Sequence, residues 1–191
     1  MKHLKTILPM LFAAITAITF TSCDKDDMIS YDLKGTWKGD MYQVSEYGGN
    51  RYNASYTELY FETSAFRTAR GIGKWIDHYS NNPYYDYFAS NIDWQVKDQI
   101  IYITFKNGDR TTLEIRNYDI DRDRFYGDIW LGDSWLHFNM YHVDSPNWSK
   151  YKWDGYHYTV NKARQTSLVP GTKPATQPEE EPQRMLNTDK K

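Results

Sequence analysis

The residues best suited to binding chemistry lie on either side of Gly132-Asp133, where two strand-like runs meet. If these two residues form the turn of a hairpin, Leu131 pairs with Ser134, and the faces of both strands follow by counting. One face is apolar, with Phe125, Ile129, Leu136, Phe138 and Met140. The opposite face places rings beside hydrogen-bonding groups: Tyr126, Asp128, Trp130, Trp135, His137, Asn139 and Tyr141.

This mixed face has two interpretations. Rings that stack on the apolar side of a sugar, next to groups that bond its hydroxyls, are what a glycan or similar polar ligand requires. We therefore expect these seven residues to bind a ligand, with Trp148 and Trp153 as candidates to extend the site. The alternative is a solvent-exposed face held by cross-strand aromatic pairs. The high aromatic content, seven Trp, 17 Tyr and eight Phe, fits both, because strands favour aromatic residues for packing alone.

Two motifs in the same region carry catalytic residue types. Gly132-Asp133-Ser134 and Asp154-x-x-His157 resemble the nucleophile and base blocks of a hydrolase family. In that family the serine block lies near the start of an α/β domain, whereas here both motifs lie late in an all-β pattern. A motif counts only in its structural context. We therefore expect no enzyme activity through Ser134 and no catalytic residues.

Metal binding is not expected either. Asp119-x-Asp121-x-Asp123 imitates the start of a calcium loop, but the loop needs Gly and Glu where this chain has Arg124 and Trp130. His137 and His142 are five positions apart on one strand, so they point to opposite faces. No metal site and no cofactor are predicted.

The strands that position these residues are best defined between Ile92 and Ile115. A turn at Lys97-Asp98 pairs Val96 with Gln99 and Trp94 with Ile101. A three-residue loop at Lys106-Asn107-Gly108 pairs Ile103 with Thr111, and we prefer it to a two-residue Asn-Gly loop, because a shift by one residue would move every side chain to the other face. The apolar side chains then share one face: Ile92, Trp94, Ile101, Ile103, Phe105, Leu113 and Ile115.

Eight strand-like runs follow one another without a convincing helical period. The first runs from Leu33 to the turn at Tyr47–Asn50, and the last is Ser134–Val143. This pattern predicts an all-β fold, a single eight-stranded antiparallel meander that closes as an up-and-down barrel, with a β-sandwich as the alternative.

Four short features are similar to small bacterial lipoproteins with a lipocalin-like barrel domain: Gly35-x-Trp37, Gly71-Ile72-Gly73, Trp94-Gln95-Val96 and Phe125-Tyr126-Gly127. The resemblance covers about residues 31–145. It implies a lipocalin-like fold and an envelope location, and it carries over no catalytic residues.

The amino-terminal sequence indicates the location of the protein in the cell. Lys2 and Lys5 precede an apolar run of 14 residues, Ile7–Phe20, which is shorter than a membrane span and typical of a signal peptide over residues 1–22. Thr21-Ser22-Cys23 resembles the lipobox of bacterial lipoproteins, with Phe20 where Leu is usual. The resemblance implies lipidation of Cys23 and membrane association. The Asp24-Lys25-Asp26-Asp27 run that follows resembles the surface-export signal of lipoproteins in some Gram-negative lineages, whereas Asp directly after the cysteine resembles an inner-membrane retention signal in others. We favour the outer membrane and leave exposure at the cell surface open. An ordinary secretory signal is the alternative.

The remaining segments are assigned from composition. Residues 23–30 are expected to form an acidic tether, 31–145 the barrel, and 146–160 an aromatic segment packed on it. Residues 161–191 have no aromatics, four of the seven prolines and three consecutive glutamates, so we expect a disordered tail. Without residues 1–22 the charge is 21 minus 25, or −4, which disfavours nucleic acid as a partner. The expected function is a non-enzymatic, lipid-anchored binding protein for a glycan or hydrophobic molecule, with an interaction or scaffold subunit of a surface complex as the alternative.

Overall fold

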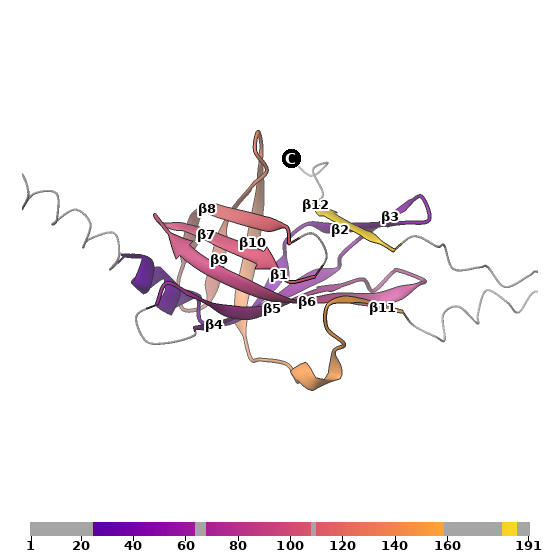
Figure 1. The fold of residues 1–191 in the computed structure, drawn as a ribbon, viewed down its shortest axis with the longest axis horizontal. Helices are drawn as coiled ribbons and strands as arrows, with labels where there is room; N and C mark the ends of the chain where they lie inside the picture. The colour runs from indigo at the N-terminus through magenta and orange to yellow at the C-terminus, as the bar shows by residue number, and fades with distance from the viewer. Residues whose placement is uncertain (1–24, 64–67, 108–109, 159–180, 187–191) are drawn as a thin grey trace, which may run out of the picture.

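The chain forms a closed antiparallel barrel with a smaller three-stranded sheet beyond one end (Figure 1). The computed structural model describes residues 25–63, 68–107, 110–158 and 181–186. The expected signal peptide and Cys23 lie outside these residues. Eight strands follow one another around the barrel in chain order, and the first pairs with the last. The expected all-β class and up-and-down barrel are therefore confirmed, and the sandwich alternative is wrong.

The barrel strands are β1 (Gly35–Asp40), β4 (Tyr56–Thr63), β5 (Arg70–His78), β6 (Tyr85–Lys97), β7 (Ile100–Phe105), β8 (Thr112–Ile120), β9 (Arg124–Trp130) and β10 (Trp135–Val143). Their inward side chains form one hydrophobic cluster that includes Trp37, Phe61, Trp94 and Phe125. Alternation is clearest in β10, where Leu136, Phe138 and Met140 are buried and the residues between them are exposed.

The β6–β7 turn lies one residue later in the chain than predicted. The strand pairs are therefore displaced by two residues, which leaves the same side chains on the inner face of the sheet. Asp98 and Gln99 form the turn with φ values of 53° and 62°, and Val96 pairs with Ile101 rather than with Gln99. A two-residue hairpin of type I′ requires positive φ at both positions, which these residues adopt. The predicted Lys97-Asp98 turn is therefore wrong.

The β7–β8 connection also differs from the prediction, because it is longer. Ile103 pairs with Leu113 rather than with Thr111, and the Phe105 N–H donates to Thr111 O over 3.0 Å. The pairing is again displaced by two residues, so the side chains remain on the predicted face of the sheet. Ile101, Ile103, Phe105, Leu113 and Ile115 are all buried, as expected.

The predicted β9–β10 hairpin is confirmed residue by residue. Trp130 pairs with Trp135, Asp128 with His137 and Tyr126 with Asn139. The Leu131 N–H donates to Ser134 O over 3.0 Å and closes the turn at Gly132-Asp133.

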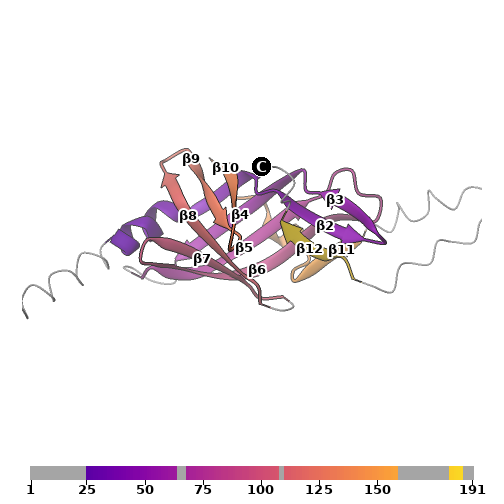
Figure 2. The same cartoon turned by 90° about the horizontal axis from the view of Figure 1, so that it is seen from above.

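The first predicted strand divides in two. Tyr42 has a φ of 51°, and the chain leaves the barrel there to form the hairpin of β2 (Gln43–Tyr47) and β3 (Asn50–Asn53). The strand β12 (Gln183–Leu186) pairs with β2 on its other side, as Figures 1 and 2 both show. The prediction of a disordered tail over 161–191 is therefore wrong for these four residues.

The opposite end of the barrel is covered by a helix over residues 25–33, at the indigo end of the ribbon in Figure 1. Leu33 joins the barrel core. The Asp26 carboxylate accepts the backbone N–H groups of Asp98 and Gln99 over 3.0 and 2.9 Å. The tether expected over 23–30 is thus a packed helix from residue 25 onward, because its acidic side chain bonds the β6–β7 turn.

Residues 146–158 cover the outer face of β5 and β6. They contain the 3-10 helix η1 (Trp148–Lys150) and β11 (Gly155–Tyr158), which pairs with the first half of β6. Trp148, Tyr151 and Trp153 pack against a buried cluster of Ile76, Tyr87 and Ala89. The aromatic segment therefore contributes a second hydrophobic layer outside the barrel.

Candidate functional site

A buried ion pair marks the end of the barrel beside β12. Arg184 donates from Nε to Asp77 Oδ2 over 2.8 Å, and Asp77 is fully buried. Asp77 Oδ1 accepts from Thr57 Oγ1 and from Trp75 Nε1, each over 2.7 Å. Removing charges from water costs several kcal/mol per ion unless such partners compensate it. The pair therefore fixes the position of β12 against the barrel.

The Arg184 guanidinium also covers three interior rings. Its Cζ atom lies 4.2 Å from the ring centroid of Phe105, 4.9 Å from that of Trp75 and 5.3 Å from that of Phe88. These separations are within the range of cation–π attraction. The side chain thus caps the aromatic interior at this end of the barrel.

A cavity of about 840 Å³ lies beside this cap. Its walls come from the ends of β7 and β9, the start of β8, the β9–β10 turn, β11 and β12. Five aromatic residues take part in the lining: Phe88, Phe105, Trp130, Tyr156 and Tyr158. The volume and the mixture of rings with polar groups are typical of small-molecule sites.

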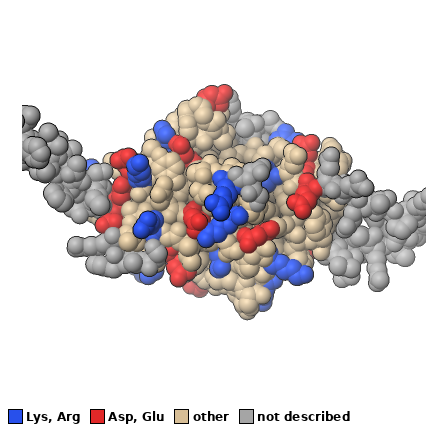
Figure 3. All heavy atoms as spheres, in the orientation of Figure 1, with Lys and Arg blue, Asp and Glu red and all other residues tan. Residues whose placement is uncertain are grey.

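The charged groups of the cavity are mainly acidic. Among the described residues that line it, Arg184 is the basic one, whereas Asp133, Asp154 and Glu181 are acidic. Asp154 accepts bonds from the backbone and side chain of Asn91. The lining therefore favours neutral or cationic groups over anions. On the face seen in Figure 3, acidic and basic side chains are interspersed.

Two buried polar atoms belong to residues of the cavity wall. Gln43 is 1% exposed, and its Nε2 donates to Met41 O over 3.1 Å. Gln43 Oε1 and Arg184 Nη2 have no hydrogen-bond partner within the described part of the chain. Buried polar atoms are normally paired. Both atoms have almost no solvent-accessible surface, so they lie behind the cavity wall rather than at its surface.

Tyrosine hydroxyls stay protonated at this end of the barrel. Burial raises the pKa of Tyr85 to about 12. Burial is also the largest cause of the raised pKa of Tyr156, which lines the cavity. A hydroxyl that keeps its proton acts as a hydrogen-bond donor at neutral pH.

The seven residues predicted as a ligand site lie together on the outer face of β9 and β10; we refer to them as the outer strip. The rings of Trp130 and Trp135 have centroids 4.1 Å apart. His137 pairs through Nδ1 with Asp128, whose other oxygen accepts from Asn117 Nδ2 over 3.0 Å. Tyr126, Trp135 and Tyr141 are exposed, whereas Asp128 is buried beneath them.

The cavity and the outer strip meet at Trp130. This residue lines the cavity together with Leu131, Asp133 and Ser134, and its ring packs at a tilt against that of Trp135 on the outer face. It is the one predicted site residue that lines the cavity. The rim of the barrel thus connects the two surfaces.

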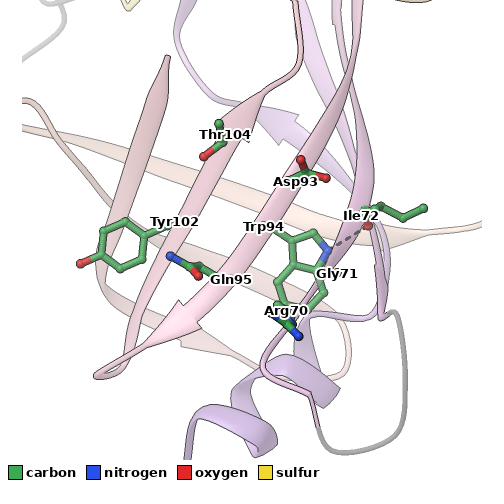
Figure 4. A pocket seen from close by; sticks show the side chains of 8 residues that line it. All are labelled: Arg70, Gly71, Ile72, Asp93, Trp94, Gln95, Tyr102 and Thr104. Atoms are coloured by element: carbon green, nitrogen blue, oxygen red, sulfur yellow. Dashed lines mark hydrogen bonds between the residues drawn. The ribbon is translucent and has the colours of Figure 1, made fainter. Parts of the chain in front are cut away.

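A second hollow, of about 390 Å³, lies on the outer side of β5, β6 and β7 (Figure 4). Trp94 donates from Nε1 to Ile72 O over 2.9 Å at its edge. A Cβ atom on Gly71 would lie 2.8 Å from the Trp94 ring, so the ring already fills the space beside this glycine.

The residues that resemble a hydrolase do not form a triad in the structure. Ser134 and Asp154 line the cavity, but the His157 ring stacks on Tyr87 at a centroid distance of 4.8 Å. His157 Nδ1 is buried without a hydrogen-bond partner in the described residues. Within the described part of the chain, no hydrogen bond joins these three side chains.

The acidic and histidine motifs have structural contacts. Asp121 Oδ1 accepts the N–H groups of Asp123 and Arg124 over 2.8 and 2.7 Å and so shapes the β8–β9 turn. His142 packs on Trp37 at a centroid distance of 5.0 Å, away from His137. Across the described ranges, no group of three or more His, Cys, Asp or Glu is placed to hold a metal ion.

No family model, curated protein or solved structure matches this chain. Within the described residues, no helix has the length and apolar character needed to cross a membrane.

Sequence reasoning missed most of the cavity. Gln43, Tyr156 and Arg184 come from three separate segments that pair only in the folded chain. The signal that was present is Arg184 beside Met185 and Leu186, an amphipathic pattern in an otherwise polar tail.

Proposed function

We propose that the chain is a lipid-anchored, non-enzymatic lipoprotein of the bacterial outer membrane that binds a small ligand, a glycan or a hydrophobic molecule. The observation that carries the proposal is the cavity of about 840 Å³ at the end of the barrel, where aromatic walls meet the polar residues Asp133, Ser134 and Asp154. This combination resembles ordinary ligand sites in size and chemistry.

The position of the amino-terminal helix supports the anchor. The helix contacts the β6–β7 turn, at the opposite end of the barrel from the cavity, and begins two residues after Cys23. Acyl chains on Cys23 would therefore direct the cavity away from the membrane. Met28 and Tyr31 on this helix are 66% and 77% exposed, and both are side chains that a membrane interface accommodates.

A cavity-filling variant tests ligand binding. The soluble domain, starting at residue 24, would be screened against glycan and lipid arrays, and each hit measured by calorimetry. Thr111→Trp, at the cavity wall, is expected to weaken binding at least tenfold. Thr104→Trp is the matched control, because Thr104 lies outside the cavity and lines the second hollow. Equal binding by both variants and the parent would place the ligand elsewhere.

An interaction subunit is the second candidate. It is favoured by the continuous hydrophobic cluster inside the barrel and by the exposed rings of Tyr126, Trp135 and Tyr141. In this case Trp135→Ala, and not Thr111→Trp, would remove a protein partner captured by crosslinking in intact cells.

A further inference from the structure

We propose that the ligand is a neutral glycan chain, bound at one end in the cavity and continuing across Trp130 along the outer strip. The inference rests on the proposed function, since it takes the cavity as the place where the ligand begins. It adds the chemical class of the ligand, its minimum length and a second contact surface.

The charges select against anionic ligands. Asp133, Asp154 and Glu181 surround the cavity, and the guanidinium of Arg184 is already paired with Asp77. A fatty acid or phosphate would add a negative charge to a site with more acidic than basic groups, which is unfavourable at short range.

The same carboxylates select against hydrocarbon. An apolar ligand would remove water from Asp133 and Asp154 without offering them a hydrogen bond, which costs free energy. Sugar hydroxyls instead donate to carboxylates, and such bonds are among the stronger ones.

The cavity and the outer strip are continuous at the rim of the barrel, which lengthens the surface that a ligand can contact. Trp130 lines the cavity and its ring packs against that of Trp135, from which the outer strip runs along β10 to Tyr141. Six residues of extended strand span about 20 Å. A single sugar unit covers only part of this length, so the full surface fits an oligosaccharide.

Neighbouring side chains hold the outer strip in place. Arg116 lies over the Trp130 ring at 5.7 Å, and Arg124 lies near the rings of Tyr126 and Tyr141 at 5.6 and 5.9 Å. Asp119 accepts from the Tyr126 hydroxyl over 2.9 Å. Contacts of this kind order side chains before binding and reduce the entropy lost on association.

Chain length provides the test. Calorimetry would compare neutral oligosaccharides of several linkages, from disaccharide to hexasaccharide, with uronic-acid oligomers of matched length. The parent domain is expected to bind a neutral series with affinity that rises with length, and to bind the acidic series at least tenfold more weakly. Trp135→Ala should remove about tenfold from hexasaccharide affinity and leave disaccharide affinity and melting temperature unchanged. Tyr102→Ala is the control, an aromatic truncation outside both surfaces.

The outcomes separate this inference from the proposed function. The proposal of a bound glycan chain would be overturned if affinity did not depend on oligosaccharide length, if the acidic oligomers bound more tightly than the neutral ones, or if Trp135→Ala had no effect. If Thr111→Trp still abolished binding in these cases, the proposed function would stand. Binding of lipids but of no neutral glycan would also overturn the glycan proposal and leave the proposed function standing. Binding of no glycan or lipid, or full binding by Thr111→Trp, would overturn both.

Discussion

Asp77 and Arg184 lie 107 positions apart in the chain and form a buried ion pair of 2.8 Å that joins a barrel strand to β12. Together with Leu186, which packs against the barrel core, this contact explains how a four-residue strand becomes part of the fold. The same guanidinium covers the rings of Phe105, Trp75 and Phe88. The pair therefore closes the aromatic interior and forms part of the cavity wall.

Removing this partner should destabilise the whole barrel. Arg184→Met keeps the length of the side chain but leaves the buried Asp77 carboxylate unpaired, which is expected to cost about 3–5 kcal/mol of unfolding free energy in urea. Gln183→Ala, at an exposed neighbouring position, is the control and should be near neutral. A chain that ends at residue 180 should lose as much stability as Arg184→Met, whereas one that ends at Leu186 keeps β12. Equal melting temperatures for the two truncated chains would refute the role of β12.

Asp26 should stabilise the barrel at its other end. Its carboxylate accepts two backbone N–H groups of the β6–β7 turn, so Asp26→Ala leaves both without this partner and is expected to cost about 1–3 kcal/mol. Asp27→Ala removes the same charge from the same helix at a less buried position and serves as the control. Equal chemical-denaturation midpoints for the two variants would contradict the assignment.

Alkaline pH should unfold the protein through its buried tyrosines. Burial is the main cause that raises the pKa of Tyr118 and of Tyr85, each to about 12. The unfolded chain ionises near pH 10. Stability is therefore fully present below pH 10 and falls as pH rises towards 12, because the unfolded state releases protons first. Circular dichroism and phenolate absorbance should change together over this interval. In Tyr118→Phe the loss should be smaller, and an unaltered pH dependence would count against this explanation.

Cys23 should anchor the protein. If its thiol is acylated, the mature chain partitions with membranes, and Cys23→Ala releases the protein into the soluble fraction while the barrel remains folded. Fractionation followed by mass spectrometry of the mature amino terminus measures both effects. Continued membrane association of the Cys23→Ala chain would exclude this anchor.

The strand pattern predicted the barrel but not every register, for a physical reason. Side chains in a strand alternate between the two faces of the sheet. An apolar pattern therefore excludes a register shift of one residue, which would change the face, but it does not exclude a shift of two. Ile101 and Leu113 therefore lie on the predicted face, although each neighbouring pair is displaced by two residues. The β6–β7 turn is set by Asp26, which is 72 positions from Asp98. Local turn chemistry could not reveal that contact.

The candidate site was less predictable than the fold. The outer strip follows from one hairpin, whose Gly132-Asp133 turn fixes all its pairs by counting. The cavity instead requires β2, β11 and β12 to assemble around the barrel end, and none of these strands carries a long apolar run. Trp130 belongs to both surfaces because it lies at the rim.

Close approach of the β4 and β5 backbones gives a last prediction. A Cβ atom on Gly71 would lie 1.9 Å from Glu62 O and 2.8 Å from the Trp94 ring, distances that force the strands apart. Gly71→Ala is therefore expected to lower the unfolding free energy by about 1–3 kcal/mol, as overpacking does. Gly155→Ala is the matched control, because a Cβ atom there meets nothing within 4 Å and the substitution also reduces the entropy of the unfolded chain. Urea denaturation should find Gly155→Ala neutral or slightly more stable than the parent. A Gly71→Ala protein as stable as Gly155→Ala would show that the strands tolerate a side chain at this contact.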